Sequence, residues 1–291
     1  MVKIVEPYGY CAGVNMALES AKNIKDAYKD RHVVMLGQLV HNNEALEELK
    51  DKGIEILYIK GKTYEELLPL VKDDDIVILT AHGHSKSIED YLNDHHIKFF
   101  DMTCPYVKTT HQNMIYSLNQ GHEIIYIGKK GHPEAIASLS LSDKVHLYDI
   151  EKGIDYSSIK DDSPVIYTQT TFSELDVKRI FNEIHTQFPK AINGKAICFA
   201  SKMRQDALLS LDKDTDLIYV IGSNFSNNTK TLYLMAKEHF ASALVKQIDN
   251  EEMVDKLDLV NKEKIAIISG ASTPKYISEK VKDKIESLLN K

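Results

Sequence analysis

The sequence has few cysteines, no long hydrophobic run and no excess of positive charge. It contains three cysteines in 291 residues, and because none is close to another they argue against a disulfide framework. The longest apolar runs, such as residues 76–79, have the length of a strand, so no transmembrane helix is available. The formal net charge of −7 argues against a nucleic-acid-binding surface. Local donors, rather than a global field, must therefore hold any anionic substrate.

The remaining composition is that of an ordinary globular protein, with 43% apolar and 27% charged residues. The length predicts two or three domain-sized units. Residues 1–7 lack the long apolar core of a signal peptide. We therefore expect a cytoplasmic protein without a membrane partner.

The three cysteines are almost evenly spaced. Cys11 and Cys104 are 93 residues apart, and Cys104 and Cys198 are 94 apart, close to one third of the 291 residues. Each follows a short strand-like segment and precedes a helical pattern. This regularity indicates an internal repeat. The alternative is ordinary α/β alternation with coincidental spacing.

Two further strand–loop–helix units follow each cysteine. The loops of the first unit carry His41, His132 and Ser226, which lie 30, 28 and 28 residues after the preceding cysteine. Each third of the chain is therefore predicted to contain three βα units, which favour a small parallel sheet flanked by helices. We expect three pseudo-symmetric α/β domains at residues 12–103, 104–194 and 195–291. A strand within residues 1–11 would complete the third domain.

The cysteines allow three interpretations. Free cysteines are often small buried hydrophobic residues, but their matched positions count against that here. Three thiolates can also bind zinc, although the usual closely paired ligands are missing. The third interpretation is an iron–sulfur cluster. Four thiolates normally hold a [4Fe–4S] cluster, so three would leave one iron open to a substrate.

Polar residues gather in the loops after the strands, where ligands of parallel sheets bind. Histidines and short hydrogen-bonding residues in such loops can bind phosphate, or they can simply cap helices. Glu134 lies two residues after one of these histidines and could supply a proton in an enclosed anion site. The candidate anion-binding residues are His41, His82, His132, Thr170, Ser226, Asn228 and Ser272.

An ordered set of motifs resembles the 4-hydroxy-3-methylbut-2-enyl diphosphate reductase (LytB/IspH) family from Cys11 to Pro274. The motifs are Tyr10-Cys11-Ala12-Gly13-Val14, Val40-His41-Asn42, Ala81-His82-Gly83, Thr103-Cys104-Pro105, Gly131-His132-Pro133-Glu134, Thr168-Gln169-Thr170-Thr171, Arg204-Gln205 and Gly270-Ala271-Ser272-Thr273-Pro274.

The resemblance implies a trefoil of three α/β domains around a central [4Fe–4S] cluster with one open iron. It implies reductive dehydroxylation of the allylic diphosphate to isopentenyl and dimethylallyl diphosphate, with ferredoxin or flavodoxin as electron donor. The residues that the resemblance assigns are the cluster ligands Cys11, Cys104 and Cys198, the catalytic residues Glu134, Thr170 and His132, and the substrate-binding residues His41, His82, His132, Thr170, Ser226, Asn227, Asn228 and Ser272.

Several positions depart from the family pattern. Tyr8 and Thr80 stand where arginine is common, Thr109 where lysine is frequent, and Phe225 and Asn227 where asparagine and serine are usual. A paralogue acting on a related allylic diphosphate is therefore an alternative. A cluster-bearing sensor or binding protein and a zinc hydrolase are the alternatives from other functional classes.

Overall fold

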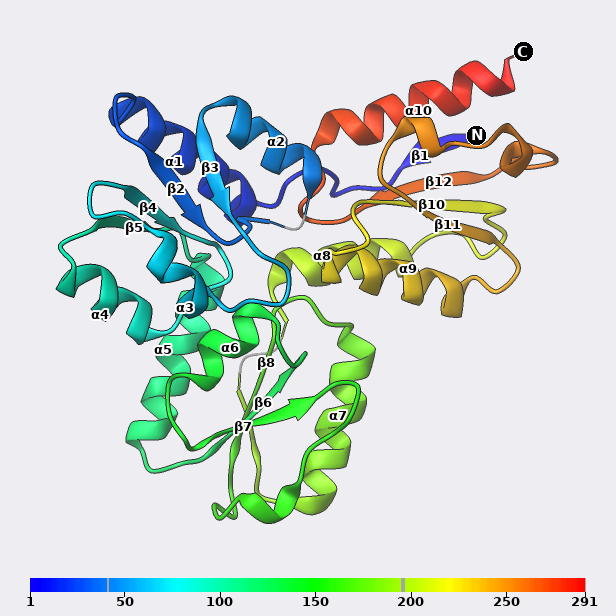
Figure 1. Ribbon diagram of the computed structural model, residues 1–291. Coiled ribbons are helices and arrows are strands. Elements are labelled where there is room, and N and C mark those ends of the chain that lie inside the picture. The colour runs from blue at the N-terminus through cyan, green and yellow to red at the C-terminus, as the bar shows by residue number, and fades with distance from the viewer. Residues whose placement is uncertain (41, 195–196, 291) are drawn as a thin grey trace.

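The computed structural model describes residues 1–40, 42–194 and 197–290, and it contains three four-stranded parallel sheets (Figure 1). In the first sheet the strand order is β3-β2-β4-β5. Its strands are β2 (Val33–Leu36), β3 (Ile54–Leu57), β4 (Ile76–Leu79) and β5 (Lys98–Asp101). The helices of this part are α1 (Ala12–Ala27), α2 (Asn43–Asp51), α3 (Tyr64–Leu67), the 3₁₀ helix η1 (Leu68–Leu70) and α4 (Lys86–Asp94).

The second sheet has the order β7-β6-β8-β9 and lies at the bottom of Figure 1. Its strands are β6 (Ile124–Gly128), β7 (Val145–Asp149), β8 (Val165–Thr168) and β9 (Ile192–Asn193). The helices are α5 (Pro105–Asn119), α6 (Pro133–Leu139), the 3₁₀ helix η2 (Tyr156–Ser158) and α7 (Glu174–Gln187).

The third sheet joins the two ends of the chain. Its order is β1-β12-β10-β11, so the N-terminal strand pairs with a strand near the C-terminus. The strands are β1 (Val2–Ile4), β10 (Leu217–Ile221), β11 (Leu244–Ile248) and β12 (Ile265–Ser269). The helices are α8 (Phe199–Leu209), α9 (Asn227–His239), the 3₁₀ helices η3 (Glu251–Met253) and η4 (Lys256–Leu259), and α10 (Lys275–Leu289).

The three sheets repeat one topology. Read from β11 to β1, the third sheet arranges its strands in the same way as the first two sheets. In each sheet the strand that leads toward a cysteine, namely β5, β9 or β1, lies at one edge. The prediction of three small parallel α/β units is therefore confirmed. The domain boundaries at residues 103/104 and 194/195 stay predictions, because strand pairing does not locate them.

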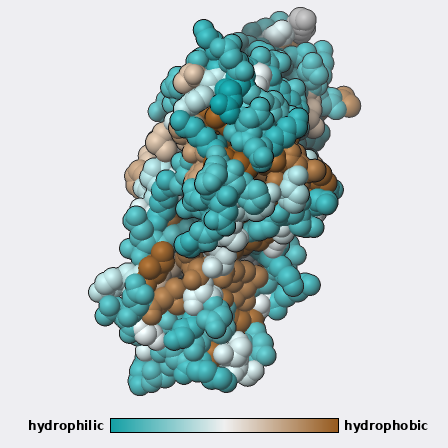
Figure 2. Space-filling model, turned by 60° about the vertical axis from the view of Figure 1, so that its left-hand side comes forward, coloured by the Kyte–Doolittle hydropathy of each residue, from teal (hydrophilic) through white to brown (hydrophobic). Residues whose placement is uncertain are grey.

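The central strands are apolar because both of their faces are covered. All residues of Ile76–Leu79, Leu217–Ile221 and Ile265–Ser269 are buried. Such continuous apolar strands are typical of parallel sheets with helices on both faces. Two hydrophobic clusters pack around each sheet, and the outer surface in Figure 2 is largely hydrophilic with a few apolar patches. In the described parts of the chain, no helix combines the length and apolar character needed to span a membrane.

Candidate active site

The three cysteines occupy equivalent places in the fold. Each is the N-cap of the helix that follows an edge strand: Cys11 begins α1, Cys104 begins α5 and Cys198 begins α8. Each cysteine amide also donates to a carbonyl oxygen in the loop after the neighbouring strand, at 3.0 Å in all three cases. The pairs are Cys11 with Ala271, Cys104 with Ala81, and Cys198 with Thr170. The threefold repeat predicted from the spacing is thus present in the backbone hydrogen bonds.

The sulfur atoms of Cys11 and Cys104 border the same small space beside Gly13. A Cβ atom placed on Gly13 would lie 2.8 Å from Cys104 Sγ and 4.0 Å from Cys11 Sγ, so only glycine leaves this space open. Burial raises the pKa of Cys104, and the nearby Cys11 and Cys198 thiolates raise it further. Among the described residues, no three His, Cys, Asp or Glu side chains are placed to bind a single metal ion.

A hydrogen-bonded chain connects two of the cysteines. The Ser201 hydroxyl lies 3.2 Å from Cys198 Sγ, and Asn228 Nδ2 donates to that hydroxyl at 3.0 Å. Asn228 Oδ1 in turn accepts from the amide of Ala271 at 2.9 Å, and the carbonyl of Ala271 holds the Cys11 amide. Asn228 is therefore placed to position the loops of Cys198 and Cys11 relative to each other.

Glu134 and Thr170 form a buried pair. The amide of Thr170 donates to Glu134 Oε1 at 2.8 Å, and its hydroxyl donates to Oε2 at 2.9 Å. The Tyr126 hydroxyl donates to Oε1 at 3.4 Å. Only 2% of Glu134 is exposed. Burial raises the pKa of its carboxyl to about 7, although the hydrogen bonds from Thr170 lower it. The carboxyl group can therefore carry a proton near neutral pH.

Two of the three predicted histidines lie together. The rings of His82 and His132 meet edge to face, with their centroids 5.5 Å apart. His132 is the N-cap of α6, and its Nδ1 accepts from the amide of Glu134 at 3.1 Å. This contact orients the imidazole beside the buried carboxyl. His41 lies outside the described residues.

The remaining predicted residues come from the third sheet. Ser226 is the N-cap of α9, and the Ser272 hydroxyl, from the loop after β12, donates to its hydroxyl at 3.5 Å. Both serines are buried. Asn227 Nδ2 is buried too and has no hydrogen-bond partner in the described part of the chain. Buried donors are nearly always paired, so this amide is suited to a ligand.

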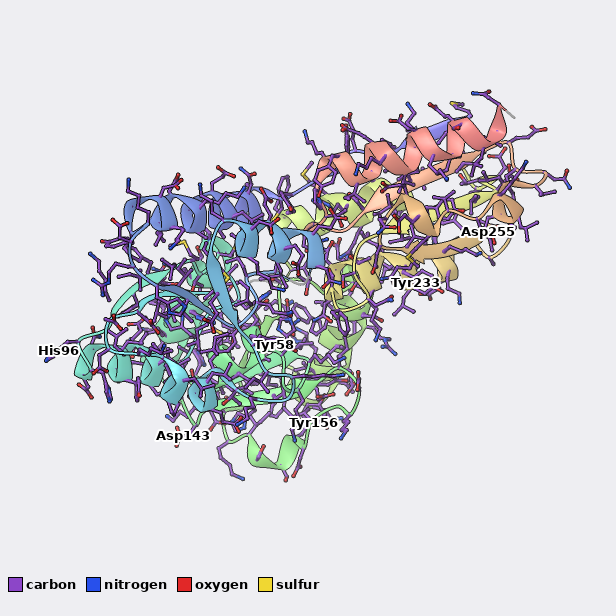
Figure 3. All side chains as sticks on the ribbon, turned by 45° about the horizontal axis from the view of Figure 1, so that its top comes forward. Tyr58, His96, Asp143, Tyr156, Tyr233 and Asp255 are labelled. Atoms are coloured by element: carbon purple, nitrogen blue, oxygen red, sulfur yellow. The ribbon has the colours of Figure 1, made fainter. Side chains whose placement is uncertain are left out.

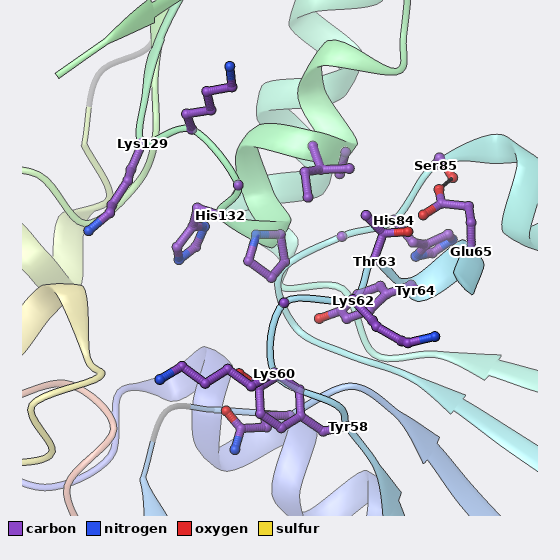
Figure 4. A pocket seen from close by; sticks show the side chains of 18 of the residues that line it. Tyr58, Lys60, Lys62, Thr63, Tyr64, Glu65, His84, Ser85, Lys129 and His132 are labelled. Carbon is purple, nitrogen blue, oxygen red and sulfur yellow. Dashed lines mark hydrogen bonds between the residues drawn. The ribbon is translucent and has the colours of Figure 1, made fainter. Parts of the chain in front are cut away.

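A pocket of about 520 Å³ opens next to this group (Figure 4). His132 and Asn227 line it, whereas the cysteines, Glu134 and Thr170 do not. Most of its wall comes from residues 58–65, 83–88 and 129–137, which belong to the first two sheets. The pocket therefore lies outside the buried pair of Glu134 and Thr170, and His132 belongs to its wall.

The model of the LytB protein family matches residues 2–286. The chain belongs to the LytB family. Curated relatives named 4-hydroxy-3-methylbut-2-enyl diphosphate reductase include one from Symbiobacterium thermophilum, 32% identical over 97% of this chain and 95% of the relative. Another, from Listeria monocytogenes, is 36% identical over 95% of this chain and 83% of the relative.

Solved structures support the same membership. The E-1-hydroxy-2-methyl-but-2-enyl-4-diphosphate reductase of Plasmodium falciparum matches all of this chain and 88% of its own, with a TM-score of 0.86 and 27% identity. A second structure is that of (E)-4-hydroxy-3-methyl-but-2-enyl diphosphate reductase, described as the terminal enzyme of the non-mevalonate pathway. It has a TM-score of 0.68 and 28% identity over 98% of this chain and 99% of its own.

Sequence reasoning about this LytB chain did not assign two buried residues next to the cysteines. Ser201, which is 1% exposed, resembles any serine in a helix, and no motif marks it. Arg204 was visible only as part of the Arg204-Gln205 motif. Its guanidinium is 2% exposed and donates to the carbonyls of Gly9 and Ser269. Burial lowers its pKa, while the Cys11 and Cys198 thiolates raise it.

Two departures from the LytB pattern have a structural account. Thr80 is fully buried, and the Tyr64 hydroxyl lies 2.9 Å from its hydroxyl. A charged arginine at this position would have to be buried against the tyrosine. Tyr8 instead donates to Glu279 at the surface. Both positions therefore carry hydroxyl groups in place of cations.

Proposed function

We propose that the chain reductively dehydroxylates 4-hydroxy-3-methylbut-2-enyl diphosphate to isopentenyl and dimethylallyl diphosphate. The observation that carries this proposal is that three cysteines occupy equivalent N-cap positions in a protein that also holds a buried carboxyl group with a pKa of about 7. The names of the LytB relatives support the substrate. Ferredoxin or flavodoxin is the proposed electron donor.

The cysteines fit a [4Fe–4S] cluster. Thiolates are the usual cluster ligands, and the space that a Cβ at Gly13 would fill lies directly beside two of the sulfur atoms. Each thiolate would hold a different iron atom of the cluster. The three sulfur atoms therefore need not surround a single point, as the ligands of one metal ion would. Cys11, Cys104 and Cys198 are the proposed ligands. When bound, the cluster supplies electrons and an iron atom with an open coordination position.

The diphosphate is proposed to lie among polar side chains that come from all three sheets. Ser226, Ser272 and Asn227 offer hydroxyl and amide donors from the third sheet. His82 and His132 offer imidazoles from the first and second. Because these groups are buried or half-buried, their hydrogen bonds to a phosphate would be strong and directional. His41, outside the described residues, keeps its proposed role from the sequence.

Glu134 is proposed to supply a proton to the departing hydroxyl group. The reaction consumes two electrons and two protons, replaces the C–O bond with a C–H bond, and releases the oxygen as water. Expelling hydroxide without a proton is slow. A carboxyl group with a pKa of about 7 holds such a proton at neutral pH, and Thr170 orients it through two hydrogen bonds.

Turnover by anaerobically purified protein with a chemical reductant tests the function. We expect the allylic diphosphate to be converted to both products, and Cys104→Ser protein to convert almost none under the same conditions. Competition with related allylic diphosphates tests the paralogue alternative, since preference for another substrate would replace the one proposed. A cluster-containing protein that binds the substrate but never reduces it would be a sensor or binding protein instead.

A further inference from the structure

The outer pocket is strongly cationic in a chain that is acidic overall. Four of its lining residues are lysines, Lys60 and Lys62 from one loop and Lys129 and Lys130 from another. Glu65 is the one carboxylate among the lining residues that the structure describes. The wall therefore has three more formal positive than negative charges, whereas the whole chain has a net charge of −7.

These lysines are available to a ligand. Within residues 1–40, 42–194 and 197–290, no ion pair joins Lys60, Lys62 or Lys130 to an acidic side chain. Lys129 lies 3.4 Å from Glu151, but this carboxylate is 61% exposed, and such surface pairs are weak. Figure 4 shows Lys60 and Lys129 extending toward the same side of the pocket as the His132 ring. A ligand at His132 would therefore lie within their field.

Apolar side chains complete the pocket wall. Tyr58, Tyr64, Ile88, Ile136 and Phe225 all line it. A pocket with ammonium groups on one part and apolar groups on another suits a small amphipathic anion. An organic diphosphate with a short hydrocarbon chain has this character.

We propose that this pocket is a capture site, whose lysines attract the diphosphate substrate and hold it before it reaches Glu134 and Thr170, which lie outside the pocket. The inference rests on the proposed function. A net charge of −7 repels a diphosphate at long range, and a concave patch of opposite sign overcomes that repulsion locally. Asn227 also lines the pocket, and its amide has no hydrogen-bond partner in the described part of the chain.

The test is the double charge reversal Lys60→Glu/Lys129→Glu. Electrostatic attraction raises the association rate of a charged ligand by about 10- to 1,000-fold. We therefore expect kcat/KM of the double variant at low ionic strength to be lower than that of the unchanged protein by about 10-fold or more. We expect kcat to stay within about threefold, because neither lysine contacts the buried carboxyl group. Raising the salt to about 0.5 M should remove most of the difference, because screening then acts over about 4 Å.

The matched control is Lys256→Glu/Lys284→Glu, which changes the net charge equally outside the pocket. Both control lysines are exposed on η4 and α10. In Figure 3, Asp255, the neighbour of Lys256, lies at the right-hand end of the molecule, whereas Tyr58 lies near its middle. If charge reversal destabilises the pocket loops, Lys60→Gln/Lys129→Gln should give a smaller loss with the same salt dependence. Equal kcat/KM in the pocket and control variants at low salt would overturn the proposal.

Calorimetric titration of the holoprotein with inorganic diphosphate separates this inference from the proposed function. We expect the pocket variant to bind diphosphate at least about 10-fold more weakly than the control at low salt. A protein that shows this loss but reduces no allylic diphosphate retains the anion site and refutes the reductase function. A protein that turns over normally and binds diphosphate equally in both variants refutes only the capture site.

Discussion

Replacing Glu134 with glutamine separates a proton donor from a structural carboxylate. The substitution keeps the length of the side chain, and its amide can still accept from the Thr170 amide and donate to the Thr170 hydroxyl. These two contacts are 2.8 and 2.9 Å in the native site. We therefore expect Glu134→Gln protein to fold, load the cluster and bind substrate.

The expected kinetic loss is large. Loss of a positioned general acid costs about 10²- to 10⁴-fold in rate, and 100-fold corresponds to about 2.7 kcal/mol in the barrier. If Glu134 acted only as a first-turn acid of α6, its contribution would be about 0.3–1 kcal/mol of stability with almost no effect on rate. The two interpretations therefore differ by well over tenfold in kcat.

Glu174→Gln is the matched control, because Glu174 is also an acid in the first turn of a helix, α7. Its carboxylate pairs with Lys202, and this contact lowers its pKa instead of raising it. The assay is anaerobic turnover with saturating reductant and equal iron content in both variants. Near-normal kcat in Glu134→Gln, like that expected for Glu174→Gln, would reject the proton-donor role and favour a sensor.

Three other expectations can be checked with the same preparations. Changing Cys11, Cys104 or Cys198 to serine should abolish or strongly reduce iron loading, because a hydroxyl is a poorer iron ligand than a thiolate; normal iron in all three variants would contradict the cluster assignment. Ser201→Ala removes a hydrogen bond to the Cys198 sulfur, so the cluster potential measured by redox titration should become more negative, and an unchanged potential would show that this contact is lost in the holoprotein. The pKa of Glu134 is raised, so its protonated form stabilises the folded protein. This contribution to stability is full below pH about 4.5 and is lost as the pH rises through about 7. We expect kcat to fall over the upper part of that pH range, and the same fall in Glu134→Gln protein would assign the titration to another group.

Much of the architecture followed from local pattern. The apolar runs that became β4, β10 and β12 are short and continuous because both faces of these strands are buried. Strand, cysteine and helix follow one another within a few residues, so their order was visible along the chain. A strand within residues 1–11 was expected to complete the third domain, and the structure pairs β1 with β12.

The site was only partly predictable. Glu134 and Thr170 were both expected near a substrate, but their contact joins residues 36 positions apart, one in the first turn of α6 and one in the loop after β8. The role of Ser201 depends on Asn228 reaching it from another helix, 27 positions away. The pocket lysines stand in ordinary solvent-exposed loops, and nothing in their local sequence distinguishes them from other surface lysines.

The sequence by itself determined the repeat, the parallel sheets and the chemistry of the candidate ligands, because each depends on residue type and on spacing along the chain. Tertiary structure decided what surrounds those ligands. Burial raises the pKa of Glu134 to about 7, and the approach of the first two sheets gathers four lysines around one cavity. Desolvation and electrostatic fields depend on which surfaces meet, and surfaces meet through contacts between distant segments that no local pattern encodes.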